Sequence, residues 1–392
     1  MEWKEYQIQD VCRLINGRAY SNDEMLEHGK YKIVRVGNLS GGNSTWFYSD
    51  LELPADKYCH NGDLLFAWAC TFGPHIWKED NTIFHYHIWK IVEDKDVVDR
   101  RFFCYYLKFA TGGFLGALNG SVMVHITKSS MEKMIIRIPK KLEDQRRIAS
   151  ILSSLDRKIE LNNKINADLE EMAQAIFKNW FVDFEPFKNG KFVDSELGMI
   201  PEGWKVGRLT EIASYMNGLA MQKFPPENNE DSLPVLKIKE LGQGFCGTDS
   251  DRCSCNIKDE CKIHNGDVIF SWSGTLLVDV WCGGDCGLNQ HLFKVTSKDY
   301  PKWFYYYWTK HHLQEFVHIA KDKAVTMGHI KRGHLEEAMV AIPDNDSMEK
   351  AHELFEPILS KMISLRLESS RLSLLRDTLL PRLMSGELEV PE

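Results

Sequence analysis

The chain has 392 residues, of which 43% are hydrophobic and 27% charged, as in an ordinary globular protein of two or three domains. No apolar run approaches the roughly 18 residues that a membrane span needs, and the charged N-terminus MEWKEYQIQD has no apolar signal core, so we expect a cytoplasmic protein. The net charge of −8 disfavours a free-standing nucleic-acid-binding domain, because most of these are basic, unless local basic clusters or a basic partner contribute.

The first predicted region, residues 1–142, has the pattern of an α+β module. Short β-branched and aromatic runs such as YKIVRV (31–36), LLFAW (64–68) and IFHYHIWKIV (83–92) indicate strands bounded by turns. A short helix is expected around residues 101–110.

A long helix is predicted next, over residues 143–185. Residues 143–181 contain neither Gly nor Pro. Two rows recur every seven residues, as in a coiled coil: Ile148, Leu155, Asn162, Leu169, Ile176 and Leu152, Ile159, Asn166, Ala173, Trp180. At 1.5 Å per residue this helix would be roughly 55 Å long. Asn162 and Asn166 would lie on the seam and fix its register; the alternative is that they face solvent.

The same order then repeats. A linker is predicted at 186–203, a second module at 204–346 with a helix at 303–317, and a second long helix at 347–392. This last helix carries the heptad row Phe355, Met362, Ser369, Arg376, Leu383, flanked by Ile358, Leu365, Leu372 and Leu379.

Six ordered matches identify an internal duplication. NGDLLFAW (61–68) matches NGDVIFSW (265–272), at an offset of 204 residues (265 − 61). YHIWKI (86–91) matches QHLFKV (290–295), VHIT (124–127) matches GHIK (328–331), and Ile138-Pro139 matches Ile342-Pro343. WK and NG at 3–4 and 16–17 recur at 204–205 and 217–218. We therefore expect two duplicated α/β domains joined by two long antiparallel coiled-coil helices, with pseudo-twofold symmetry and a module at each end. Each Asn-Gly is predicted to form a primed hairpin turn before a core strand.

A cysteine cluster in the second module is a candidate zinc site. It comprises Cys246, Cys253, Cys255, Cys261, Cys282 and Cys286, with His264 nearby. Cys253-Ser-Cys255 is too tight for the usual ligand pair, and the first module lacks matching cysteines, so reduced thiols are favoured over metal.

No catalytic constellation is found. The sequence lacks an Asn/Asp-Pro-Pro-aromatic methyltransferase motif and a GxxxxGK[ST] phosphate loop, and Pro343-Asp344 with Glu349-Lys350 has the wrong spacing for a nuclease. His87 and His291 follow the apolar alternation of a strand and are interpreted as core histidines. The sequence therefore favours binding over catalysis.

Two modules on a rigid spacer suit a target with two half-sites, for which duplex DNA is the natural case. Loops beside the repeated strand carry side chains suited to bases or phosphates; the alternative for each is an ordinary solvated loop residue. In the first module the candidates are Thr71, His75, Lys78, Asn119, Ser121, His125 and Lys128. In the second module they are Ser271, Ser273, Thr275, Lys321, Lys323, Thr326, His329, Lys331 and Arg332.

Three stretches resemble the specificity subunit of Type I restriction–modification enzymes. LGMIPEGWKVGRL (197–209) is similar to the entry of that family's second target-recognition domain. ILSSLDRKIELNNKINADLEEMAQAIFKNWFVDFEPF (151–187) resembles its central conserved helix, and LLRDTLLPRLMSGELEV (374–390) resembles its C-terminal one. The first module begins at Trp3 without the Ile-Pro-x-Gly lead-in of the second.

This resemblance implies a non-catalytic subunit in which each domain reads half of a bipartite DNA sequence. The helices would space the halves and dock two methyltransferase subunits, which motor-nuclease subunits would join. S-adenosylmethionine, ATP and magnesium would be held by those partners, with no cofactor in this chain. Two alternatives remain: a zinc-dependent or DNA-cleaving enzyme, and a protein-binding scaffold.

Overall fold

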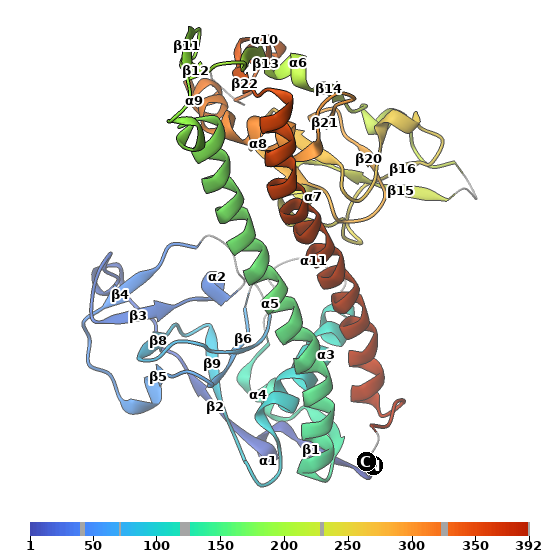
Figure 1. The fold of residues 1–392 in the computed structure, drawn as a ribbon. Helices are drawn as coiled ribbons and strands as arrows, with labels where there is room; N and C mark the ends of the chain where they lie inside the picture. The colour runs from blue at the N-terminus through green and yellow to red at the C-terminus, as the bar shows by residue number, and fades with distance from the viewer. Residues whose placement is uncertain (40–43, 70–71, 118–125, 228–230, 323–327, 391–392) are drawn as a thin grey trace. The chain divides into compact units, whose positions relative to one another are not determined.

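The computed structural model describes residues 1–39, 44–69, 72–117, 126–227, 231–322 and 328–390, and the chain divides into two compact units (Figure 1). Unit 1 comprises Met1–Lys158 and Leu372–Glu392, and unit 2 comprises Ile159–Arg371. Both boundaries fall inside the two long helices, α5 (Leu142–Phe181) and α11 (Asn345–Ser385). Each unit therefore contains one globular module and one stretch of each long helix.

The described residues of the module of unit 1 form three small sheets. The first sheet is antiparallel, in the order β2 (Cys12–Asn16), β9 (Ile88–Glu93), β6 (Leu64–Ala67), β7 (Gly73–Ile76). The second has the order β4 (Phe47–Ser49), β3 (Tyr31–Val34), β8 (Thr82–Phe84), β5 (Tyr58–Cys59), with β3 and β8 parallel. The third pairs β1 (Trp3–Gln7) with β10 (Ile135–Pro139).

The module of unit 2 repeats this topology strand for strand. Its first sheet has the order β14 (Ser214–Asn217), β21 (Leu292–Thr296), β18 (Val268–Ser271), β19 (Leu277–Val280). Its second has the order β16 (Arg252–Ser254), β15 (Ser232–Leu236), β20 (Cys286–Leu288), β17 (Lys262–Ile263), again with one parallel pair, β15 and β20. Its third pairs β13 (Lys205–Arg208) with β22 (Met339–Ile342). The predicted duplication is confirmed at the level of strand order.

Helices cover the sheets in both units. Those of unit 1 are α1 (Ile8–Val11), α2 (Val36–Leu39), α3 (Arg100–Ala117) and α4 (Lys128–Glu132). Those of unit 2 are α6 (Leu209–Ile212), α7 (Ile238–Gln243), α8 (Lys302–His311), α9 (Leu313–Asp322) and α10 (Arg332–Glu337). The helix expected around 101–110 is α3, and the one expected at 303–317 is two helices, α8 and α9.

The repeated strand lies between two apolar cores, which explains its unbroken hydrophobic run. In β6, Leu64 and Phe66 belong to the core that includes α3 and the long helices, whereas Leu65 and Ala67 belong to the core shared with the second sheet. In β18, Phe270 belongs to the core that includes α8 and the long helices, whereas Ile269 belongs to the core shared with the second sheet. A strand buried on both faces cannot show the polar–apolar alternation of a half-exposed strand.

The Asn-Gly turns differ from the primed hairpins that the sequence predicts. Asp63 N donates to His60 O at 3.0 Å and Asp267 N donates to His264 O at 3.1 Å, so each Asn-Gly occupies the centre of a four-residue turn. Only the glycine has a positive φ, +91° at Gly62 and +92° at Gly266, as in a type II turn. These turns also join strands that are not partners, since β5 pairs with β8 whereas β6 pairs with β7 and β9.

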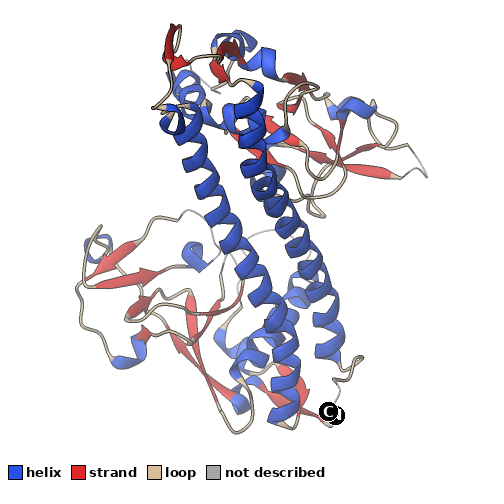
Figure 2. Ribbon diagram, in the orientation of Figure 1, coloured by secondary structure: helices blue, strands red, loops and turns tan. Residues whose placement is uncertain are grey.

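The two long helices pack antiparallel within each unit (Figure 2). In unit 2, Phe177 of α5 lies 6.2 Å from Phe355 of α11 between ring centroids, and Asn162 is hydrogen-bonded to Glu368. In unit 1, Asp156 is hydrogen-bonded to Arg376. As the residue number on α5 increases from 156 to 177, the number of its partner on α11 decreases from 376 to 355. The helices therefore pair in the antiparallel sense that the sequence predicts.

Both seam asparagines of α5 are buried. Asn162 is 0% exposed and Asn166 is 8% exposed, so the alternative that they face solvent is wrong. Asn162 Nδ2 donates to Glu368 Oε2 at 2.8 Å. The Asn166 amide has no hydrogen-bond partner in the part of the chain that the structure describes.

The stretch predicted as a linker, 186–203, contains a hairpin. β11 (Phe192–Ser195) pairs with β12 (Gly198–Pro201), and Gly198 turns the chain with φ +83°. Trp204, directly after it, packs against Phe184 and Phe187 at 5.5 and 4.9 Å between ring centroids. This stretch is therefore folded on the aromatic core of unit 2.

Candidate nucleic-acid interface

A tight turn precedes β9 in unit 1 and β21 in unit 2, and both copies have the same backbone. Ile88 N donates to His85 O at 2.9 Å, and Leu292 N donates to Asn289 O at 3.0 Å. Tyr86 and His87 therefore occupy the centre of the first turn, and Gln290 and His291 occupy the centre of the second.

A glycine fixes each turn against the edge of β2 or β14. Gly17 N donates to Ile88 O and Gly218 N donates to Leu292 O, both at 3.1 Å. A Cβ at Gly17 would lie 2.2 Å from His85 O, and one at Gly218 would lie 2.2 Å from Leu288 O. The backbones approach so closely that only glycine fits, which accounts for the repeated NG at 16–17 and 217–218.

A tryptophan directly after the repeated strand forms backbone hydrogen bonds both to this turn and to a third segment, which contains Ile126 in unit 1 and Ile330 in unit 2. In unit 1, Trp68 N donates to His87 O at 3.1 Å and Trp68 O accepts from Ile126 N at 3.4 Å. In unit 2, Trp272 N donates to His291 O at 3.5 Å and Trp272 O accepts from Ile330 N at 3.1 Å. The three stretches that match between the repeats thus converge at one place in each unit.

A cavity of about 310 Å³ opens at this place in unit 1. Trp68 forms one side, with its ring 6.0 Å from Tyr86 and 5.7 Å from Trp89 between centroids. The residues that line the cavity are Asn16, Gly17, Trp68, Tyr86, Trp89, Ile126, Thr127 and Lys128. Lys128 forms an ion pair with Glu132 at 3.6 Å. Three aromatic side chains, Trp68, Tyr86 and Trp89, and one cation, Lys128, thus line this cavity.

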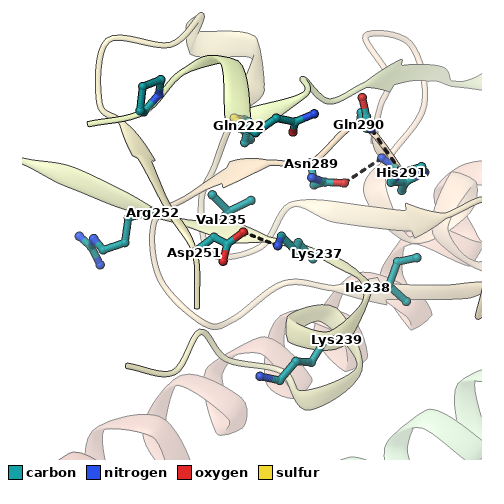
Figure 3. Close-up of a pocket in the computed structure, with 12 residues that line it drawn as sticks. Gln222, Val235, Lys237, Ile238, Lys239, Asp251, Arg252, Asn289, Gln290 and His291 are labelled. Atoms are coloured by element: carbon teal, nitrogen blue, oxygen red, sulfur yellow. Dashed lines mark hydrogen bonds and ion pairs between the residues drawn. The ribbon is translucent and has the colours of Figure 1, made fainter. Parts of the chain in front are cut away.

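A larger cavity, of about 580 Å³, lies beside the equivalent turn of unit 2 (Figure 3). Asn289, Gln290 and His291 line it from the turn, and Lys237, Lys239 and Arg252 line it from the second sheet and α7. Lys237 forms an ion pair with Asp251, which also lines the cavity, and Lys239 forms one with Asp249 at 2.5 Å. Amide and imidazole groups next to lysine and arginine are side chains suited to base edges and phosphates.

The imidazoles of the first turn are held neutral. Burial lowers the pKa of His85 to about 4, with smaller contributions from His87 and Arg35. Burial also lowers the pKa of His87. At neutral pH each ring therefore offers one hydrogen-bond donor and one acceptor instead of a positive charge.

The structure brings two of the candidate residues of the second module directly together. Ser273 forms a β-bridge with His329, and its Oγ lies 3.1 Å from His291 Nδ1. The His329 ring is 6.3 Å from Trp272 between centroids. Thr275 is exposed in the following loop. Ser271 is fully buried, and its hydroxyl donates to Ser273 O at 3.2 Å. The burial of Ser271 does not support a direct DNA contact.

The remaining described candidates lie on separate elements of the two units. Lys331 precedes α10 and Arg332 begins it, and both are exposed, as is Lys321 on α9. In unit 1, Lys78 is exposed after β7. His75 is half-buried on β7, and burial, with Lys108, lowers its pKa. Outside the described residues lie the candidates Thr71, Asn119, Ser121, His125, Lys323 and Thr326.

Sequence reasoning missed the turn residues themselves. It interpreted His87 and His291 as core histidines, and this was wrong because both precede their strand: His87 is half-buried and His291 is exposed. The apolar alternation begins only at Ile88 and Leu292. The signal that could have found them was the position of Tyr86-His87 and Gln290-His291 at the same offset, each just before a strand.

The cysteines of the second module are divided between apolar clusters. Cys253 and Cys261 pack with Met221 and Ile257, whereas Cys286 packs with Trp281. A hydrogen bond with Cys286 lowers the pKa of Cys246. Among the residues that the structure describes, no group of three or more His, Cys, Asp or Glu side chains could hold a metal ion. None of the described helices combines the length and apolarity required to span a membrane.

Two copies of one α+β module, each with the same convergent turn, strand and loop, define a protein of two repeated domains. The model of the Type I restriction modification DNA specificity domain matches residues 1–171 and 201–365, and the chain belongs to this family. The two matched ranges correspond to the two repeats.

Individual relatives agree with this assignment. The chain is 32% identical over 303 residues to the Type I restriction enzyme MjaIX specificity subunit of Methanocaldococcus jannaschii, a match that covers 73% of this chain and 66%, just under two thirds, of that relative. It is 21% identical to the Type I restriction enzyme HindI specificity subunit of Haemophilus influenzae, over 99% of this chain and 100% of that protein.

The fold also matches a solved structure. The crystal structure of the Type I restriction–modification system S subunit from M. genitalium superposes with a TM-score of 0.56 at 16% sequence identity, over 97% of this chain and 96% of that chain. At this identity the likeness shows the fold: duplicated modules and long packed helices.

Proposed function

We propose that this chain is the sequence-specific DNA-binding subunit of a Type I restriction–modification complex, in which each module reads one half of a bipartite duplex sequence. One observation carries the proposal: the same turn, strand and loop converge through the same backbone hydrogen bonds in both units, while the side chains displayed there differ. A shared backbone arrangement that displays different side chains would allow the two modules to bind two different half-site sequences.

The long helices would separate the two modules and dock two methyltransferase subunits. Several exposed apolar side chains on α5 and α11 would be available to such partners. They are Leu161, Met172, Leu354, Leu374 and Leu375. Motor-nuclease subunits would join this assembly for restriction, and the assembly would act on DNA in the cytoplasm.

Chemistry would belong to the partners. S-adenosylmethionine would be bound by the methyltransferase subunits, and ATP and magnesium by the motor-nuclease subunits. These partners would also supply much of the positive charge for DNA binding, which relieves the difficulty posed by a net charge of −8 in this chain.

The test is duplex binding by the chain purified together with the methyltransferase subunit of its host. Affinity is measured against a library of duplexes in the presence of excess non-specific DNA, at fixed salt. We expect enrichment of one bipartite motif with a constant spacer. Equal affinity for all sequences would contradict the proposal and would favour a protein-binding scaffold, and modification or cleavage of DNA by the isolated chain would favour an enzyme.

A further inference from the structure

We infer that the first central residue of the repeated turn, Tyr86 in unit 1 and Gln290 in unit 2, determines which base each module accepts at one position of its half-site. This inference rests on the proposed function and names the side chains that would distinguish the two half-sites.

The two residues are structurally equivalent. They are 204 positions apart (290 − 86), and each directly follows a residue that forms a parallel β-bridge to the segment after the fixing glycine, Arg18 to His85 and Leu219 to Asn289. Each turn is closed by the same hydrogen bond, at 2.9 Å in unit 1 and 3.0 Å in unit 2. The backbone at residue 86 therefore has the same hydrogen-bonded arrangement as the backbone at residue 290, and the two positions differ in their side chains.

Both residues line the cavity of their own unit. Tyr86 is 40% exposed and lines the aromatic cavity with Trp68 and Trp89. Gln290 is half-buried and lines the basic cavity with Asn289 and Arg252, as Figure 3 shows. The unit 1 cavity is formed with Trp68 and residues 126–128, whereas the unit 2 cavity is formed with the second sheet and α7, so the first central turn residue is the position that the two linings have in common.

The neighbouring histidine is shared, so it cannot account for a difference between half-sites. His87 packs on Tyr86 at 3.8 Å between centroids, and His291 is oriented by Ser273 and by Asn289, whose Oδ1 accepts from His291 N at 3.2 Å. The side chain next to it is an amphipathic ring in one module and a carboxamide in the other.

These two chemistries favour different base edges. A glutamine carboxamide can both donate and accept, so it pairs bidentately with the N6 and N7 atoms of adenine in the major groove. A tyrosine ring offers an apolar face to the methyl group of thymine, and its hydroxyl offers one donor and one acceptor. We therefore assign adenine preference to Gln290 and thymine preference to Tyr86.

The experiment uses the complex of the full chain with the methyltransferase subunit of its host and the duplex library described above. Gln290→Ala is expected to lower discrimination at one base pair of one half-site by about 10- to 100-fold and to leave the other half-site unchanged. Tyr86→Ala is expected to do the same in the other half-site, and Tyr86→Gln to shift preference there toward adenine. Gln314→Ala, at an exposed position of α9, is the matched control for Gln290→Ala and should leave the motif unchanged.

The outcomes separate the inference from the proposed function. A wild-type complex without sequence preference would overturn both. A wild-type bipartite motif that neither variant alters, in proteins whose thermal unfolding matches the wild type, would overturn the inference and leave the proposed function standing. Loss of preference spread over both half-sites would also contradict it, since each residue lies in one unit only.

Discussion

Asn162 on α5 donates a hydrogen bond of 2.8 Å to Glu368 on α11, where the two long helices pack together. One turn further along α5, Asn166 is 8% exposed and its amide has no partner among the described residues. Buried polar groups in helix pairs reduce stability but restrict the register in which the helices can pair. The two asparagines therefore should respond differently to replacement.

Asn162→Leu is expected to lower the free energy of unfolding by about 1–3 kcal/mol, because the hydrogen bond to a charged carboxylate is lost. Asn166→Leu is expected to be neutral or stabilising, because it removes a buried amide that has lost its hydrogen bonds to water and forms none with the described residues of the protein. Urea unfolding followed by circular dichroism measures both. Equal destabilisation by the two leucines would show that the hydrogen bond to Glu368 contributes nothing.

Glycine is required where each turn approaches its neighbouring strand. Gly218→Ala would place a methyl group 2.2 Å from Leu288 O, so we expect a loss of about 1–3 kcal/mol of stability together with weaker DNA binding. Gly242→Ala is the control, since a Cβ there meets nothing within 4 Å and lies in helix α7, where alanine should stabilise by up to about 1 kcal/mol. Thermal unfolding distinguishes the two, and an unaffected Gly218→Ala protein would contradict the close approach.

The ion pair that joins the two long helices in unit 1 should make stability depend on pH. Burial raises the pKa of Asp156, but hydrogen bonds from Arg376 at 2.8 Å and Tyr105 at 2.5 Å outweigh it and lower the pKa overall. A carboxyl with a lowered pKa in the folded state stabilises the protein above its ordinary pKa of 3.8, and this stabilisation is lost as pH falls through the lower folded value.

Asp156→Asn should therefore be less stable than the wild type at pH 7, by about 1 kcal/mol or less because solvent screens this half-exposed pair. The difference should shrink as the pH falls below 4, where the wild-type carboxyl also becomes protonated. Urea unfolding at pH 7, 5 and 3 measures it. A difference that grew toward acid pH would have the wrong sign and would contradict the assignment.

Lys331 should contact phosphate without reading sequence. It is exposed before α10, beside the segment that joins Trp272, and its hydrogen bond to His334 uses the backbone amide, which Lys331→Ala preserves. We expect uniformly weaker binding to all duplexes and a salt dependence whose slope falls by about 1. Lys205→Ala, exposed on β13, is the control. An unchanged slope for Lys331→Ala would exclude the phosphate contact.

The sequence predicted the fold more fully than the site. Repeated sequence matches and heptad rows predicted the duplicated modules and the long helices. Burial of one face of a helix imposes a regular spacing of apolar residues, and this spacing can be read directly from the sequence. The sequence places Ser271 among the loop candidates for DNA contact, but Ser271 is the last residue of β18, a strand that is buried on both faces. Gln290 and His291 were missed because a turn is set by backbone hydrogen bonds and by the glycine at 218, which no local pattern around residue 290 reveals.

The central claim is that this chain gives a methylating complex one bipartite target. Sequencing of methylated bases in the genome of the host, with and without the gene for this chain, tests it most directly. We predict that one modified motif with two half-sites and a fixed spacer disappears when the gene is deleted and returns when it is restored. An unchanged set of methylated motifs, with the methyltransferase subunit still expressed, would contradict the claim.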